Sequence, residues 1–243
     1  MLSRERVRKA IRFEEPDRVP LDLGGSVFLT GICAGAYNAL KNHLGFPELP
    51  TEVWDPVTMT VRVEEPIRRR LGLDVVCLTV RAMQFGRNHE HYTTWHLPSD
   101  GTKVRMPPTF AVTQTQDGGY MLRAPWPLYM PKGGHYFDHA HPSGAGLLDA
   151  VDMTLKKPDL KAMRAQSGAY PPTSEAEVFL RDEARHYHHN TDYALLDEWI
   201  GIGLPTGESI AGLTNAIMLM REDPDYVHEW FDILAEGAVR RIP

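Results

Sequence analysis

Polar residues follow three apolar segments that the sequence pattern predicts as buried strands, and these residues are the best placed to do chemistry. In parallel α/β folds, ligands bind at the carboxyl ends of the strands. Carboxylates there supply acid and base groups, an arginine binds anions, and glycines free the backbone, which favours a polar or anionic small molecule as ligand. The candidate catalytic residues are Asp22, Arg81 and Glu198, and the candidate substrate-binding residues are Gly24, Gly25, Ser26, Thr79 and Asp197. Capping of the following helices is the alternative role for Asp22 and Asp197.

The histidines offer a metal alternative that their spacing does not favour. They fall into three groups, and none has the HExxH order or another recognised ligand spacing. Those groups are His89 with His91, His139 with His141, and His186 with His188 and His189. The last group is expected at the carboxyl end of a helix, where the helix dipole favours it without any ligand. The sequence therefore predicts no metal site.

The glycine-rich segments do not indicate a nucleotide site. Residues 24–26 lack the third glycine of a dinucleotide fingerprint, and the chain has neither a GxxxxGK[ST] loop nor a GxSxG elbow. Aromatic residues between 126 and 137 could line an apolar pocket, although packing of a long loop explains them as well. They are Trp126, Tyr129, Tyr136 and Phe137.

Strands that alternate with helices must position these groups. The spacing predicts a helix over 3–13, a strand over 18–23 and a helix over 32–44. A charged helix over 58–71, kinked at Pro66, and a strand over 73–80 repeat that order. The first helix carries a basic face, which is either an arm that binds phosphate or a face exposed to solvent. Its members are Arg4, Arg6, Arg8, Lys9 and Arg12.

The segment from 90 to 171 interrupts the alternation. Turn signals at 99–101 and 117–119 separate alternating segments and predict an antiparallel hairpin insertion. An irregular loop is expected from about 124 to 171. Regular structure then returns with a helix after a capping-box pattern at 174–177, a strand over 192–196, a helix over 207–220 and a last helix that opens at Asp223 and Pro224. The fold class is thus α/β with parallel strands.

Composition excludes several classes of protein. The 243 residues are 42% apolar and 24% charged, which is enough for a core and excludes disorder. No run of residues is apolar enough to span a membrane, and the charged N-terminus is not a secretory signal. A net charge of −6 disfavours nucleic acid as the main partner. Two distant cysteines, Cys33 and Cys77, exclude a disulfide framework. A cytoplasmic protein is expected.

The opening of the chain points to a known family. Residues 4–7 read RERV, and residues 14–25 read EEPDRVPLDLGG. Weaker support comes from 71–74, 100–102 and 223–227. On these motifs the chain resembles the uroporphyrinogen decarboxylase superfamily, in particular its branch of cobalamin-dependent methyltransferases. The resemblance implies a TIM-type (β/α)₈ barrel whose pocket lies at the carboxyl mouth. It implies one domain over 1–243, with residues 90–171 as an insertion.

The chain departs from the decarboxylases of this family at their substrate-binding positions. An arginine-bearing stretch after their first strand is replaced here by residues 22–26, and their second-strand aspartate is replaced within residues 77–80. Their later catalytic tyrosine has no match near Ile210. A porphyrinogen carries several carboxylates and needs several cations. The expected mouth offers Arg81 and little else, which disfavours decarboxylation of a tetrapyrrole.

The methyltransferase branch is the better match. Its members move a methyl group between a small molecule and a corrinoid protein, and hold zinc through His-x-Cys and a later cysteine. Cys33 and Cys77 match none of these positions, so we expect the chain to be an N-terminal part of a longer protein, without an identifiable zinc or corrinoid site. The alternatives are a tetrapyrrole decarboxylase, and a non-catalytic binding module or pseudoenzyme. An open sheet edge after the third strand would favour self-association into a homo-oligomer.

Overall fold

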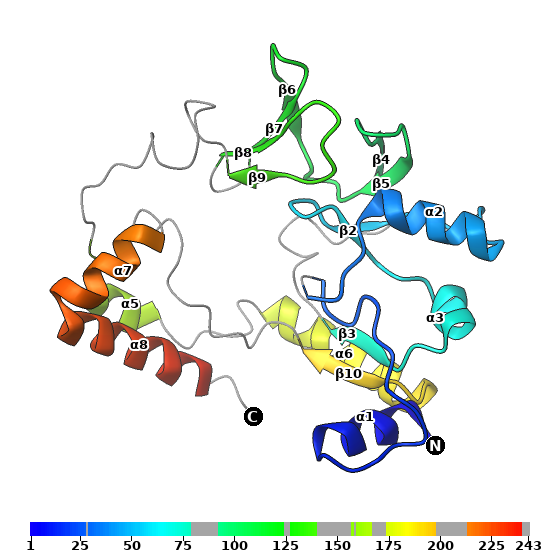
Figure 1. Cartoon of the computed structure of the whole chain (residues 1–243), viewed down its shortest axis with the longest axis horizontal. Coiled ribbons are helices and arrows are strands. Elements are labelled where there is room, and N and C mark those ends of the chain that lie inside the picture. The colour runs from blue at the N-terminus through cyan, green and yellow to red at the C-terminus, as the bar shows by residue number, and fades with distance from the viewer. Residues whose placement is uncertain are drawn as a thin grey trace. The chain divides into compact units, whose positions relative to one another are not determined.

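The computed structural model describes residues 1–27, 29–78, 92–123, 127–139, 157, 159–166, 174–197 and 213–239 (Figure 1). These residues form a mixed α/β structure with small sheets, and no closed barrel is present among them. The chain divides into two compact units. The first holds Met1–Ala140 and Val178–Glu198, and the second holds His141–Glu177 and Trp199–Pro243.

Three helices and all the named strands belong to the first unit, together with most of a fourth helix. The helices are α1 (Ser3–Ile11), α2 (Ala34–Leu44), α3 (Glu65–Leu71) and α6 (Ser174–Asn190). The strands are β1 (Val53–Asp55), β2 (Thr60–Val61), β3 (Val75–Leu78), β4 (Thr93–His96), β5 (Lys103–Met106), β6 (Val112–Gln114), β7 (Tyr120–Arg123), β8 (Pro127–Met130), β9 (Asp138–His139) and β10 (Ala194–Asp197).

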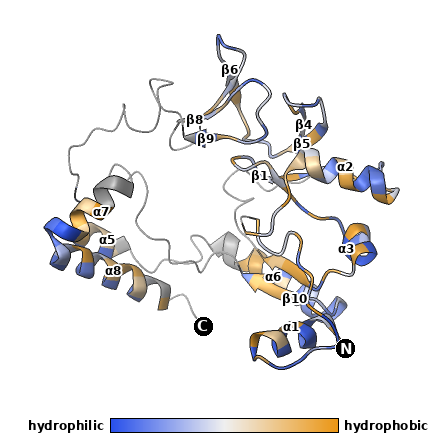
Figure 2. Ribbon diagram, viewed as in Figure 1, coloured by the Kyte–Doolittle hydropathy of each residue, from blue (hydrophilic) through white to orange (hydrophobic). Residues whose placement is uncertain are grey.

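The parallel strands that the sequence predicts are β3 and β10. They pair in register along four residues, from Val75 opposite Ala194 to Leu78 opposite Asp197. Both are largely apolar, as Figure 2 shows; β3 is buried from Val75 to Cys77, whereas the last two residues of β10 are exposed. On one face, Val76 packs against Tyr187 of α6 and against Tyr193. The parallel α/β prediction is confirmed for this pair, whereas the barrel is not confirmed.

Antiparallel hairpins form the insertion, as the turn signals predict. Strands β4 and β5 pair around Gly101, and β6 and β7 pair around Gly118. Both glycines have positive φ, 72° and 83°, a conformation that a side chain would strain. The expected irregular loop from 124 to 171 is wrong in part, because β8 and β9 extend the second hairpin into a four-stranded sheet and residues 160–166 form helix α5 (Leu160–Gln166). Pairing with β7 gives β8 the partner that its sequence alone does not indicate.

The predicted strand over 18–23 is wrong, and two local features explain its absence. Pro20 has no backbone N–H, and the N–H of Leu21 donates to the side chain of Asp74 at 2.8 Å. The segment keeps one strand-like bond, from the Asp74 N–H to the Leu21 carbonyl at 2.8 Å. It therefore lies beside the start of β3 without forming a ladder.

The predicted helix over 58–71 is wrong in its first half. Residues 60–61 form β2, which pairs with β1 and bridges to Cys33, and the helix α3 begins only at Glu65. Pro66 stands in the first turn of α3, where its missing N–H costs nothing. The proline thus starts the helix instead of kinking it, and residues 58–64 are left for the core sheet.

The main core of the first unit lies between α2, α3 and the antiparallel strands. Tyr37, Met59, Ile67, Val104 and Met106 are fully buried there. The phenol of Tyr37 accepts a hydrogen bond from the N–H of Glu64 at 2.8 Å, which ties the entry of α3 to α2. Helix α2 covers the expected 32–44 segment and ends at Gly45, which has a positive φ of 84°.

The second unit is helical in its described part. It contains α5, α7 (Leu213–Glu222) and α8 (Pro224–Val239), packed around Leu219, Val227 and Trp230. Asp223 accepts the N–H of Tyr226 at 3.3 Å, so it caps α8 as the sequence predicts. The expected helix over 207–220 agrees with α7 from residue 213 onwards, and residues 207–212 lie outside the described part.

Candidate functional site

Residues 22–30, which we call the glycine loop, hold four of the predicted site residues together. Asp22 accepts the Gly25 N–H at 2.7 Å with one carboxylate oxygen and the Thr30 hydroxyl at 3.0 Å with the other. The Ser26 N–H donates to Thr30 Oγ1 at 2.9 Å. The Gly24 N–H donates to the Thr30 carbonyl at 2.8 Å. Asp22 and Thr30 therefore close the loop from its two ends.

Four of the described backbone amides of this loop donate to acceptors within the loop itself. Besides the three amides just described, the Leu29 N–H donates to Ser26 Oγ at 2.9 Å. A phosphate-binding loop instead keeps its amides available for the ligand. These four amides therefore stabilise the loop itself and are not free to bind a phosphate. Thr30 is a residue of the loop that the sequence analysis did not identify. It lies eight residues after Asp22, a spacing that belongs to no motif considered above.

The glycine loop is seated on β3. A Cβ placed on Gly25 would lie 2.7 Å from Val75 Cγ1 and 2.4 Å from an oxygen of Asp22, so only glycine fits there. Further along, buried Val27 packs with Cys77 of β3 and with Trp54 of β1. Hence the loop follows β3 toward its carboxyl end, although the strand over 18–23 that the sequence predicts before it does not form.

Asp197 lies at that same end of the parallel pair. It is exposed, and it stands opposite Leu78, the last residue of β3. Thr79, Arg81 and Glu198 lie outside the described residues. The structure therefore assembles Asp22, Gly24, Gly25 and Ser26 in one loop, and it puts Asp197 at the end of the neighbouring strand.

Arg62 brings a cation that the sequence analysis missed. Its guanidinium lies over the Trp54 ring, 5.4 Å from the centroid, and donates to the Tyr187 hydroxyl at 3.4 Å. Burial alone would lower the pKa of Arg62, but Tyr187, Glu64 and Glu52 outweigh it and raise that pKa. The residue was hidden inside the expected helix over 58–71. Trp54 in turn belongs to the buried cluster that contains Val27 of the glycine loop. Arg62 therefore places a positive charge next to a residue of that cluster.

The cysteines do not fit the zinc centre that the family resemblance implies. Cys33 donates its thiol to the Thr58 carbonyl at 3.6 Å, and burial raises the pKa of that thiol. Cys77 is buried in β3 beside Val27 and Trp54. No group of three His, Cys, Asp or Glu side chains within the described ranges could hold a metal. We therefore derive no chemistry through zinc or a corrinoid from these residues.

Two of the predicted histidines have partners near the end of α6. His188 contacts Arg4 and His186 contacts Asn190, both at the end of α6. His139 belongs to β9, and His89, His91 and His141 lie outside the described residues. Of the aromatic residues expected near a pocket, Phe137 is buried in the main core, Tyr129 donates to Asp117, and Tyr136 is exposed. Trp126 lies outside the described part.

Comparisons with known proteins add no relative to this description. No family model, curated protein or solved structure matches the chain. In the described part of the chain, no helix combines the length and apolar character that a membrane crossing requires. The site is therefore argued from its residues alone.

Proposed function

We propose that the chain contributes a substrate-binding wall to a protein of the uroporphyrinogen decarboxylase superfamily that transfers a methyl group between a small molecule and a corrinoid protein. The observation that carries the proposal is the seat of the glycine loop on β3, beside the parallel strand β10. Ligands of parallel α/β folds bind at such carboxyl ends. The family opening in residues 4–25 supports the choice of reaction.

The described residues support binding more directly than they support chemistry. Both carboxylate oxygens of Asp22 are engaged by Gly25 and Thr30, so Asp22 fixes the loop that would face a ligand. This arrangement favours a positioning role for Asp22. Acid and base chemistry would then fall to Glu198, whereas Arg81, which stays protonated, would bind an anionic group of the substrate.

The test is transfer of a labelled methyl group. The purified full-length protein is incubated with methyl donors that carry the label and with a corrinoid protein, and label in the corrinoid fraction is counted. We expect transfer that falls at least tenfold in Asp22→Asn, because the loop loses an anchor. Lack of transfer with every donor and corrinoid protein would overturn the proposal.

A second candidate function is binding of a small acid without turnover. The engaged carboxylate of Asp22, together with the absence of a metal-type cluster from the described segments, favours it. Calorimetry with small carboxylic acids that shows tight binding while no methyl group moves would support this candidate. Release of carbon dioxide from uroporphyrinogen by the same preparation would replace both candidates with a tetrapyrrole decarboxylase.

A further inference from the structure

A groove between α1 and β10 lies apart from the candidate site. Its volume is about 330 Å³, and it is bordered by one face of α1, by the start of β10 and by the end of α6. The lining residues are Arg4, Val7, Arg8, Ile11, Arg12, His188, Tyr193, Ala194 and Leu195. The groove thus adjoins the amino end of β10, whereas the candidate site follows the carboxyl end of β3.

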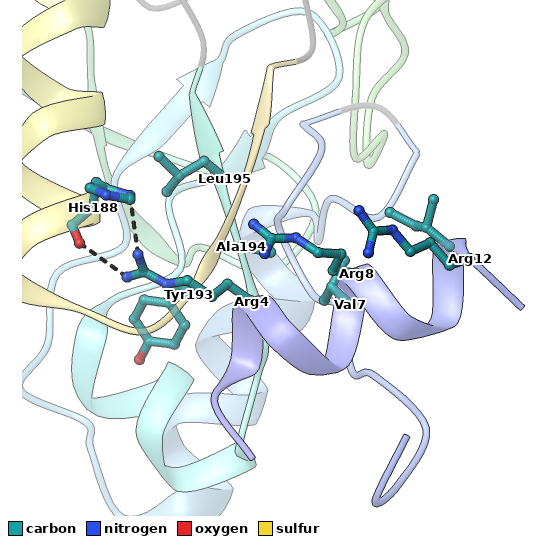
Figure 3. A pocket seen from close by; sticks show the side chains of 9 residues that line it. Arg4, Val7, Arg8, Arg12, His188, Tyr193, Ala194 and Leu195 are labelled. Carbon is teal, nitrogen blue, oxygen red and sulfur yellow. Dashed lines mark hydrogen bonds between the residues drawn. The ribbon is translucent and has the colours of Figure 1, made fainter. Parts of the chain in front are cut away.

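All charge that lines the groove is positive. Arg4, Arg8 and Arg12 recur every fourth residue and lie along one side of α1 (Figure 3). No aspartate or glutamate is among the lining residues. Arg4 and Arg8 belong to α1 and Arg12 directly follows its last residue, so the three like charges repel each other along this side, and an anion bound between them would relieve that repulsion. Arg6, the other arginine of α1, is buried elsewhere and is not part of the row.

The guanidinium of Arg4 is already hydrogen-bonded within the protein. Its guanidinium donates to the carbonyls of His188 at 3.1 Å, Asp192 at 3.4 Å and Thr191, at the end of α6. It also contacts His188 Nδ1 at 3.1 Å (Figure 3). Arg4 therefore fixes the wall of the groove.

Arg8 and Arg12 differ from Arg4. Both are exposed, and neither has a side-chain partner within the described ranges. Beside them the groove is apolar, through Val7, Ile11 and Leu195. Ile11 is 71% exposed, which leaves an apolar side chain in water next to two unpaired cations.

We propose that this groove binds an amphipathic anion, namely a carboxylate with a short apolar chain. The carboxylate pairs with Arg8 and Arg12, because guanidinium groups bind carboxylates through two parallel hydrogen bonds. The apolar chain covers Val7, Ile11 and Leu195 and removes their surface from water. The volume of the groove, about 330 Å³, lies at the lower end of the range for ligand pockets and is sufficient for a single short chain.

The test is calorimetric titration of the purified protein with octanoate. Inorganic phosphate and acetate serve as head-group probes, since each carries negative charge but neither carries a long apolar chain. We expect octanoate to bind one to one, at least tenfold more tightly than either probe, and to weaken as salt rises. Phosphate that binds as tightly as octanoate would overturn the amphipathic ligand.

Variants locate the binding. Arg8→Gln and Arg12→Gln should each weaken octanoate binding three- to tenfold, and Arg8→Lys should recover part of the loss. Lys9→Gln removes the same charge from the same helix outside the groove, and it should leave the affinity unchanged. Unfolding in urea checks that the variants remain folded. Octanoate binding that is unchanged in the double variant Arg8→Gln/Arg12→Gln would overturn the proposal. The double variant keeps Asp22, so its methyl transfer is expected to equal that of the unaltered protein, whatever its affinity for octanoate.

Discussion

The carboxylate of Asp74 is fully buried and pairs with Arg18 at 2.7 Å. Its other oxygen accepts a hydrogen bond from the guanidinium of Arg6. The same guanidinium donates two hydrogen bonds, of 2.6 and 2.8 Å, to the carboxylate of Asp17. The Leu21 N–H completes the shell of Asp74 at 2.8 Å. These contacts join α1, the extended segment after it and the start of β3. The glycine loop begins one residue after Leu21, so this ion-pair network sets where the loop starts.

Removal of Asp74 should be costly. Asp74→Ala leaves the buried Arg6 and the half-covered Arg18 without their shared anion, which typically costs about 3–5 kcal/mol when a buried pair is broken. The free energy of unfolding in urea measures the loss. Asp182→Ala is the matched control, since Asp182 pairs with Arg185 at 4.0 Å and both side chains are more than 60% exposed. That exposed pair should contribute less than about 1 kcal/mol. Equal losses in the two variants would show that the network is not structural.

Acid should destabilise the protein through the same network. The hydrogen bond from Arg6 lowers the pKa of Asp17 far below its usual value. For Asp74, burial alone would raise the pKa, but hydrogen bonds from Arg18, Leu21, Ser3 and Arg6 lower it. Because both pKa values are lower in the folded state, their stabilisation is present above the unfolded value of about 3.9 and is lost as the pH falls below it.

Urea midpoints at pH 7, 4 and 3 measure this dependence. We expect a marked fall in stability between pH 4 and pH 3, and a smaller fall in Asp17→Asn, which cannot take up the proton. A variant that loses as much stability as the unaltered protein over that interval would contradict the assignment to Asp17.

The seat of the glycine loop can be tested with one methyl group. In Gly25→Ala the new Cβ meets Val75 and the Asp22 carboxylate, and moving Asp22 breaks its bonds to Gly25 and Thr30. Such overpacking typically costs about 1–3 kcal/mol. Gly35→Ala adds the same methyl group in α2, where the nearest atom is an oxygen of the exposed Asp100 side chain at 2.9 Å and no backbone atom lies in the way, so it should cost less than Gly25→Ala. Urea unfolding compares the two, and a Gly25→Ala variant as stable as Gly35→Ala would contradict the described seat.

The sequence predicts those parts of the fold in which local signals and packing agree. The apolar run at 75–78, which begins with two valines, marks a buried strand, and turn glycines at 101 and 118 mark hairpins. The prediction fails where a distant partner takes a backbone group. The carboxylate of Asp74, 53 residues away, captures the Leu21 N–H and prevents a strand.

The candidate site shows the same limit. Asp22, Gly24, Gly25 and Ser26 are neighbours in sequence, so a motif finds them. Thr30 and Arg62 contribute through contacts that depend on how the loop and β1 pack, and no spacing encodes those contacts. The sequence of the first helix likewise does not indicate which of its arginines is buried. Arg6 is buried in the ion-pair network, whereas Arg8 and Arg12 are exposed.

Phe13 offers a substitution that should stabilise the protein. It follows the carboxyl end of α1 with a positive φ of 59°, and it is 99% exposed. The Phe13 N–H donates to the Ala10 carbonyl and the Glu14 N–H to the Lys9 carbonyl, which is the Schellman arrangement that normally selects glycine. A side chain in this conformation costs about 1–2 kcal/mol, and glycine returns part of that gain as lost backbone entropy.

We therefore expect Phe13→Gly to raise the free energy of unfolding by about 0.5–1 kcal/mol, because no buried contact of the phenyl ring is lost. The reverse change is available at α2, which ends in the same way at Gly45 with open space around it. Gly45→Ala should lower stability by about 1 kcal/mol for the same reason. Urea unfolding of both variants measures whether the free energy of unfolding rises in Phe13→Gly and falls in Gly45→Ala. A loss of stability in Phe13→Gly would contradict the expected gain from relieving the positive φ of residue 13.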